Sequence, residues 1–204
     1  MRTVTMYPVV DAEKCRGCKI CERVCPVLSI KVEAKKAAVA LEHCLGCANC
    51  EQRCPETAIT MVRLEQPRLV RQAMDGLDQD AVAGLCRKAR LNPKQIICYC
   101  TATRAEEAAA AILAGARSPE DVSRMTGVRS GCKVECIQPV LRLLRAAGIV
   151  PERPAKGYQW YGLTPTAWDI PEEVKKKYGK RGFYFDEDRK VLELVVAADE
   201  RSEG

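Results

Sequence analysis

Two related stretches, residues 15–26 (CRGCKICERVCP) and residues 44–55 (CLGCANCEQRCP), determine how the N-terminal part of this chain is organised. Both have the spacing C-x2-C-x2-C-x3-C-P, and Cys44 lies 29 positions after Cys15. The same offset relates residues outside the cysteines: Gly17 and Gly46, Glu22 and Glu51, Pro26 and Pro55, Ile30 and Ile59. An internal repeat indicates two copies of one structural unit, so we expect internal pseudo-twofold symmetry.

Short strand-like segments flank both motifs. Residues 9–10 and 39–41 precede the cysteines, and residues 29–32 and 58–62 follow them. These segments contain β-branched and apolar residues, which favour strands. We therefore predict that residues 1–66 form one small α+β domain.

The cysteine spacing of the repeat is typical of iron–sulfur ligands. Three thiolates from one tight loop can bind three irons of a cubane, and in two-cluster proteins the fourth thiolate comes from the other motif. We expect two [4Fe–4S] clusters, with these ligand sets: Cys15, Cys18, Cys21 and Cys54 for the first, and Cys44, Cys47, Cys50 and Cys25 for the second. Zinc is the alternative, although zinc sites favour two separated C-x2-C pairs. Gly17 and Gly46 are expected to allow close backbone approach and to direct amide N–H groups at the sulfurs.

With these motifs, the chain resembles the bacterial two-[4Fe–4S] ferredoxin family over roughly a third of its length. All eight cysteines keep the family pattern. The resemblance implies a ferredoxin-like two-cluster domain that transfers single electrons at low potential.

A second cysteine set follows residues 67–95, which we interpret as a connector with one helix over residues 78–90. Cys98-x-Cys100 and Cys132-x3-Cys136 supply four more thiolates, which suit a [2Fe–2S] cluster or a zinc ion. Between them we expect a strand and then three short helices within residues 96–150. The helix signals are Thr103 with Glu106 as a capping box, Ser118-Pro119 as a second start, Gly127 as its end, and a third helix over 136–148 with Pro139 in its first turn.

This second unit resembles the [2Fe–2S]-binding domain of bacterioferritin-associated ferredoxin. The matching text comprises Cys98-Tyr99-Cys100, residues 111–118 (AILAGARS), residues 125–127 (MTG) and residues 130–132 (SGC). The resemblance implies a small, mostly helical domain with a [2Fe–2S] cluster on Cys98, Cys100, Cys132 and Cys136. The family has C-x2-C at the second pair, whereas this chain has one more residue there, which puts the ligand geometry in doubt.

The remaining residues, 151–204, form a C-terminal extension that holds eight of the ten aromatic residues: Tyr158, Trp160, Tyr161, Trp168, Tyr178, Phe183, Tyr184 and Phe185. We predict a helix over 171–178 and a β-hairpin that pairs residues 182–186 with 190–196. The last eight residues are polar and are expected to be disordered. Aromatic residues are enriched at interfaces, so we interpret the extension as a docking segment, with a mini-core of its own as the alternative.

Several other residues have weaker interpretations. Cys86 is the thirteenth cysteine and is expected to be free and buried. His43 adjoins Cys44, but every ligand position is already a cysteine, so an exposed or packed histidine is the expectation. The basic residues Arg104, Arg117, Arg129 and Lys133 either balance cluster charge, dock an acidic partner, or are simply solvated.

Composition excludes several function classes. One histidine in 204 residues leaves no Ser–His–Asp triad pattern, and we find no G-x-G-x-x-G or P-loop motif. We therefore expect no catalytic site on this chain. The formal charge of +6 is offset by ligated thiolates, and Lys175-Lys176-Lys177 is flanked by acidic residues, so no nucleic-acid partner is expected. The sequence has no apolar signal core and no stretch long enough for a membrane span; we expect a cytoplasmic protein.

Taken together, these patterns favour an electron-transfer subunit. It would relay single electrons between a redox carrier and a catalytic oxidoreductase subunit, most naturally a flavoprotein, in a hetero-oligomer of anaerobic metabolism. An iron–sulfur scaffold or iron-delivery adaptor is the first alternative, and a zinc-bearing interaction module is the second.

Overall fold

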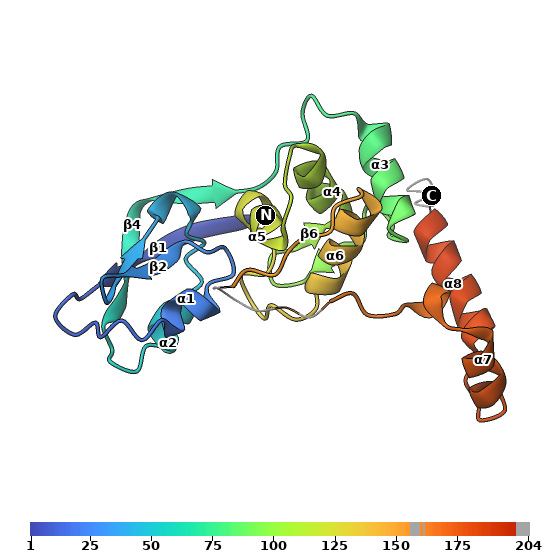
Figure 1. Ribbon diagram of the computed structural model, residues 1–204. Helices are drawn as coiled ribbons and strands as arrows, with labels where there is room; N and C mark the ends of the chain where they lie inside the picture. The colour runs from blue at the N-terminus through green and yellow to red at the C-terminus, as the bar shows by residue number, and fades with distance from the viewer. Residues whose placement is uncertain (156–159, 161, 199–204) are drawn as a thin grey trace.

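A computed structural model of the chain describes residues 1–155, 160 and 162–198. These residues form a mixture of helices and strands with small sheets, as the α+β prediction required (Figure 1). The first part contains β1 (Arg2–Val10), α1 (Ile20–Val24), β2 (Ile30–Glu33), β3 (Lys36–Val39), η1 (Leu41–His43), α2 (Asn49–Gln52) and β4 (Ile59–Val70). The second contains α3 (Gln79–Lys88), β5 (Ile96–Cys98), β6 (Thr103–Arg104), α4 (Ala105–Leu113), α5 (Pro119–Thr126) and α6 (Ile137–Ala146). The extension contains η2 (Ala167–Asp169), α7 (Glu172–Gly179) and α8 (Phe185–Ala197).

The strand pairing in the first part reproduces the sequence repeat. β1 pairs with β4 in antiparallel fashion, and β2 pairs with β3 in the same way. Val10 is opposite Ile59, and Val39 is opposite Ile30. Because both pairs of partners are related by the 29-residue offset, the strand before each motif is joined to the strand after the other motif. The predicted pseudo-twofold symmetry is therefore present in the hydrogen-bond register.

A small core lies between these two antiparallel strand pairs and the cysteine loops. Its most buried members are Val4, Val27, Ile30, Leu45 and Ile59, each at most 4% exposed. They come from β1, β2, β4 and the two loops, so the same side chains that hold the sheet pairs together also surround the cysteines.

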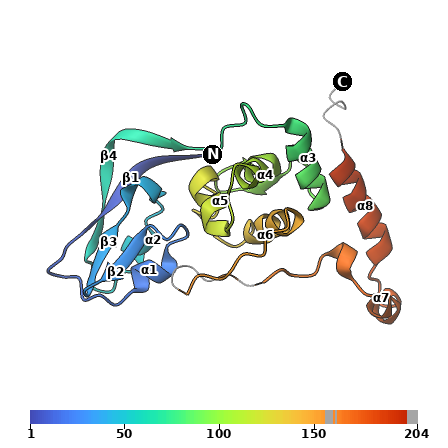
Figure 2. The ribbon, with the colours of Figure 1, turned by 45° about the horizontal axis from the view of Figure 1, so that its top comes forward.

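A second core is built from α3, α4, α5 and α6 (Figure 2). The predicted connector helix is present as α3, where the Asp78 carboxylate accepts hydrogen bonds from the N–H groups of Asp80 and Ala81. α3 contributes Val82, Leu85 and Cys86 to this core and packs against α4 and α6. Four consecutive fully buried alanines, residues 108–111, allow close approach of the neighbouring helices to α4.

Most of the predicted helix ends are confirmed. Ser118 caps α5 by accepting the Asp121 N–H at 3.1 Å, Gly127 ends the helix with a φ of 80°, and Pro139 lies in the first turn of α6. The capping box at Thr103 is wrong by one residue. Arg104 is the capping residue, and its N–H donates to Glu107, because the Thr103 hydroxyl is buried and bonded to Thr101 at 2.7 Å.

The extension contains one correct and one wrong prediction. α7 confirms the helix expected over 171–178. The β-hairpin over 182–186 and 190–196 is wrong, because residues 185–197 form the single helix α8. Three acidic residues, 186–188, occupy the first turn of α8, where the helix dipole favours negative charge. Arg189 then reaches Asp186 at 3.9 Å and Glu193 at 3.6 Å, at helical spacing.

The aromatic residues of the extension have mixed environments. Trp160 is 6% exposed, and its indole N–H donates to Glu120 of α5. Phe183 stacks on Phe185 but remains 55% exposed. Tyr158 and Tyr161 lie outside the described residues, as do residues 199–204 of the polar terminus. Within the described part of the chain, every helix is too short or too polar to serve as a membrane span.

Candidate metal centres

Cysteines from both motifs surround a first cavity, which we call site I. Cys15, Cys18 and Cys21 lie on the loop before α1 and on its first turn, and Cys54 comes from the end of the second motif. All four line one small cavity, whose walls are completed by apolar side chains from the strands, among them Val32 and Ile59. The predicted ligand set is therefore brought together, including the one cysteine that comes from the other repeat.

The symmetry-related cavity, site II, has the reciprocal set. Cys44, Cys47 and Cys50 share it with Cys25 of the first motif. Its apolar walls include Val27, Ile30, Leu45 and Met61. Such walls limit access of water, which is one of the means by which a protein tunes an iron–sulfur potential.

The pKa values of the buried thiols in sites I and II indicate that these sites bind a positively charged group. Burial, reinforced by the neighbouring thiols, raises the pKa of Cys21 to about 11 and that of Cys50 to about 12. Burial also raises the pKa of Cys44. Four thiolates would not share such a cavity unaided, whereas coordination to metal deprotonates thiols.

The donor set of sites I and II favours a cluster over a single ion. In the ranges that the structure describes, no three Cys, His, Asp or Glu side chains converge closely enough to hold one metal ion. The eight cysteines of sites I and II have the C-x2-C-x2-C-x3-C spacing of cubane ligands, whereas zinc sites favour two separated C-x2-C pairs, so the donors fit a cubane better than zinc. Iron ligation by these eight cysteines remains a prediction.

Hydrogen bonds to sulfur are already present at both sites. The Gly46 N–H donates to Cys44 at 3.4 Å, as expected for this glycine. Its φ is 59°, and an added Cβ would lie 2.6 Å from the Met6 carbonyl oxygen. At Gly17, with a φ of 72°, an added Cβ would come equally close to Lys35. Both glycines are thus required by a left-handed backbone pressed against a neighbouring segment.

The second cysteine set, site III, consists of an inner and an outer pair. Cys98, at the end of β5, and Cys136, which precedes α6, are 2% and 1% exposed, whereas Cys100 and Cys132 are exposed. A hydrogen bond with Cys136 lowers the pKa of Cys98 to about 5, while the same bond and burial raise that of Cys136. Hydrogen bonds from the N–H groups of Val134 and Glu135 lower the pKa of Cys132.

The longer loop between Cys132 and Cys136 is accommodated by its backbone. Lys133, inside the loop, has a φ of 63°. The Cys132 N–H donates to the Cys100 sulfur at 3.4 Å, which joins the two exposed thiols. All four predicted ligands are therefore in one place, with the additional residue taken up by the left-handed turn. They fit a two-iron cluster with two buried and two exposed ligands.

Gly131 makes this arrangement possible, which gives a first prediction. A Cβ at this position would lie 2.6 Å from the Cys100 sulfur, closer than atoms can approach without displacement. We expect Gly131→Ala to lose most of the [2Fe–2S] absorption and electron paramagnetic resonance (EPR) signal after anaerobic reconstitution. Gly84→Ala is the matched control, because an added Cβ there meets nothing within 4 Å and alanine favours helix by up to about 1 kcal/mol. Equal cluster content in both variants would contradict the assignment of Cys100.

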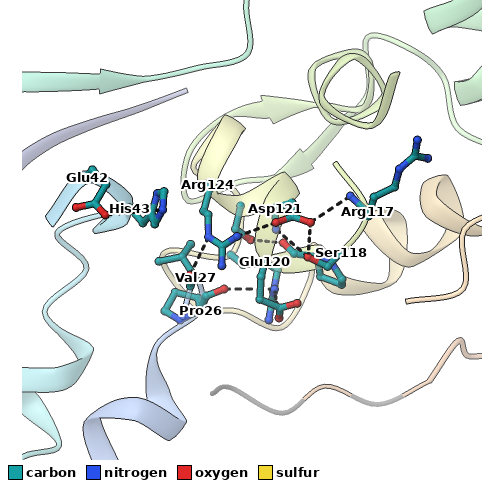
Figure 3. Close-up of polar contacts among 12 residues, drawn as sticks. Pro26, Val27, Glu42, His43, Arg117, Ser118, Glu120, Asp121 and Arg124 are labelled. Carbon is teal, nitrogen blue, oxygen red and sulfur yellow. Dashed lines mark hydrogen bonds and ion pairs between the residues drawn. The ribbon is translucent and has the colours of Figure 1, made fainter. Parts of the chain in front are cut away.

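Cys86 and His43 both lie where the sequence predicted. Cys86 is fully buried in the helical core, and burial raises its pKa to about 12, which agrees with the expectation of a free, buried thiol. The His43 side chain is half exposed and lies 3.9 Å from Glu42 (Figure 3). It is an exposed histidine, as expected.

The basic residues of the second domain have a role that the sequence did not reveal. Arg124 donates to the Val27 carbonyl at 3.0 Å (Figure 3). Arg129 contacts the Pro26 carbonyl at 3.5 Å, and Lys133 contacts the Val24 carbonyl at 3.4 Å. All three acceptors flank Cys25. Of the four basic residues singled out, Arg129 and Lys133 are thus at the interface between the domains. Arg104 and Arg117 contribute main-chain N–H groups to local carboxylates.

Arg129 is the most deeply placed of these cations. Its side chain is fully buried and pairs with the Glu120 carboxylate at 2.9 Å, while its Nε and Nη2 have no hydrogen-bond partner among the described residues. Its own main-chain N–H hydrogen-bonds to the sulfurs of Cys98 and Cys136. The residue therefore contacts site III through its backbone and the neighbour of Cys25 through its side chain.

Two family models match separate segments of the chain. Residues 7–55 match a family model described as a 4Fe-4S dicluster domain, and residues 96–146 match one described as a BFD-like [2Fe-2S] binding domain. No curated protein and no solved structure shows a significant match to the chain. Iron–sulfur domains of these kinds imply a role in electron transfer. One segment of the chain thus matches a 4Fe-4S dicluster domain, and a later segment matches a BFD-like [2Fe-2S] binding domain.

Proposed function

We propose that this chain is a non-catalytic electron-transfer subunit. It would relay single electrons between a redox carrier and a catalytic, flavin-containing oxidoreductase subunit. Bound at sites I, II and III, two [4Fe–4S] clusters and one [2Fe–2S] cluster would supply one-electron oxidation and reduction. What the chain itself contributes is the placement of three cysteine sets in a fixed order.

The observation that carries this proposal is the position of site II next to site III. Lys133 adjoins Cys132 of site III and interacts electrostatically with Cys47 and Cys25 of site II. Burial lowers the pKa of Lys133, and those two thiols oppose the shift. Arg129 makes the second connection through Pro26. Site II therefore lies at the contact with the domain of site III, which is the position that a relay from site I through site II to site III requires.

The two domains are also fixed to each other at the chain's N-terminus. The Met1 amino group donates to the Thr101 carbonyl and the Thr103 hydroxyl, both at 3.2 Å. The Arg2 side chain donates to the carbonyls of Leu45 and Gly46, while its Cβ packs against Gly127 at the end of α5. Contacts on both sides of the interface support a constant separation of sites II and III, and electron transfer depends on such a fixed geometry.

The extension supports a protein partner. α8 presents apolar side chains to solvent, with Val191 at 60% and Leu194 at 72% exposure, and Tyr184 before it is 64% exposed. Contiguous exposed apolar surface of this kind is found at protein interfaces. We propose that a catalytic subunit binds here to form a hetero-oligomer, and that the chain works in the cytoplasm.

The test is anaerobic isolation of the native complex. We expect a visible iron–sulfur spectrum, a co-purifying subunit with bound flavin, and reduction of the iron–sulfur centres when that subunit's substrate is added, followed by EPR. A chain that contains zinc and absorbs no visible light would support the interaction-module alternative and contradict the relay.

The scaffold alternative has one observation in its favour, since Cys100 and Cys132 are exposed. An exposed pair of ligands would ease the release of a cluster. Rapid cluster transfer to an apo-acceptor, without reduction by any co-purifying subunit, would therefore favour a scaffold or iron-delivery role.

A further inference from the structure

Sites I and II share one hydrogen bond that follows the sequence repeat. The Ser29 N–H donates to the Cys25 sulfur at 3.3 Å, and the Ala58 N–H donates to the Cys54 sulfur at 3.3 Å. Positions 29 and 58 are related by the 29-residue offset, as are the two cysteines. The main chain thus makes the same hydrogen bond to sulfur at both sites.

Two side chains break this symmetry, and both are at site II. The Ser29 hydroxyl lies 3.5 Å from the Cys25 sulfur and also hydrogen-bonds to Cys44. The Asn49 side-chain amide donates to the Cys47 sulfur at 2.9 Å. At the equivalent positions of site I the chain has Ala58 and Ile20, which have no side-chain donor. Site II therefore has two hydrogen-bonding side chains, Ser29 and Asn49, that its repeat partner lacks.

Hydrogen bonds to cluster sulfurs raise the reduction potential, because they stabilise the extra negative charge of the reduced state. Nearby charges act in the same direction at site II, where the partly buried Lys133 interacts with Cys25 and Cys47. At site I, Arg16 and Lys19 line the cavity and Lys36 donates to the Cys15 carbonyl, but all three side chains are exposed, so solvent screens their charges. The exposure of Cys18 to solvent would raise the reduction potential of site I. This effect opposes the hydrogen bonds from Ser29 and Asn49 and the partly buried Lys133, which raise the potential of site II.

We propose that Ser29 and Asn49 are potential-setting residues that raise the midpoint potential of the cluster at site II above that of the cluster at site I. This inference rests on the proposed function, because it requires both clusters. It gives the relay a direction: electrons that arrive at site I are held more strongly at site II, next to site III.

The test is voltammetry of the full-length chain, with EPR to separate the two [4Fe–4S] waves from the [2Fe–2S] wave. In Ser29→Ala/Asn49→Leu the higher [4Fe–4S] wave should move down toward the lower one. We expect the equilibrium constant for the distribution of one electron between the two clusters to change about tenfold. This corresponds to a change of about 59 mV in the difference between their midpoint potentials. The converse variant, Ala58→Ser, places a hydroxyl at the equivalent position and should move the lower wave up.

Iron and sulfide content must match the unmodified chain in each variant, so that a shift is not confused with cluster loss. If both waves stay where they are, or if Ala58→Ser and Ser29→Ala/Asn49→Leu move the same wave, the inference is wrong while the relay stands. If the unmodified chain has no pair of [4Fe–4S] waves, the relay and this inference both fail.

Discussion

Replacing Cys54 with alanine should remove the [4Fe–4S] cluster of site I and leave site II intact, although Cys54 belongs to the second motif. The physical reason is the shared cavity, in which Cys54 stands beside Cys15, Cys18 and Cys21. An intact chain with three clusters holds about ten irons. The variant should hold about six, or about nine if a three-iron cluster survives, as iron analysis and EPR would show.

Double variants separate crossed from uncrossed ligation. Cys18→Ala/Cys54→Ala removes two ligands of one site and should lose no more iron than either single change. Cys47→Ala/Cys54→Ala removes one ligand from each site and should keep only the two irons or so of site III. The reverse pattern would show that each motif completes its own cluster. Cys86→Ala is the control and should retain all iron. Cys86 does not line the cavity of site I or site II, and no cysteine of site III is among the groups that shift its pKa.

The crossed arrangement was predictable because the repeat constrains it twice. Cysteine spacing alone assigned the sets, and the offset that relates Cys25 to Cys54 also relates the strand partners Val10–Ile59 and Ile30–Val39. Local signals were equally reliable where a side chain acts on its own helix end, as Ser118 and Asp78 do. In these cases the residues that determine the structure are close together in the sequence.

Predictions failed where a distant or competing interaction determines the local structure. Residues 190–196 are rich in Val and Leu and alternate enough to suggest a strand, but the acidic first turn and the Arg189 pairs favour a helix. Thr103 has the pattern of a capping residue, yet its hydroxyl is used by Thr101 and by the Met1 amino group. Thr101 is a close neighbour that competes for the hydroxyl, and Met1 is far away in the sequence.

The interface between the domains was the largest omission. Arg124, Arg129 and Lys133 are ordinary surface residues by type, since arginine and lysine are almost never fully buried unless paired. Only the fold shows that their acceptors are the carbonyls around Cys25, about a hundred residues earlier. The repeat carries no information on this contact, because only one of its two halves meets the second domain at these carbonyls.

Replacing Arg129 with methionine should be the most destabilising change outside the cysteines and glycines, by about 3–5 kcal/mol. The reason is that Glu120, itself 3% exposed, would keep a buried carboxylate whose remaining side-chain donor is the Trp160 indole. Anaerobic denaturant titration followed by circular dichroism measures the loss. Arg124→Met is the matched control: Arg124 also reaches the first domain, but its ion pair with Asp121 is partly exposed, so the cost should stay near or below about 1 kcal/mol.

Adding Glu120→Gln to Arg129→Met tests the cause of that loss. A neutral glutamine can still accept from Trp160 and leaves no uncompensated charge, so the double variant should regain a large part of the stability, with a coupling energy of about 1–3 kcal/mol. It should not regain the contact with the Pro26 carbonyl. Electron transfer between sites II and III should therefore remain slower in the double variant than in the unmodified chain, measured by freeze-quench EPR after reduction of site I. Full recovery of both stability and rate would show that Arg129 only neutralises Glu120 and has no part in joining the two domains.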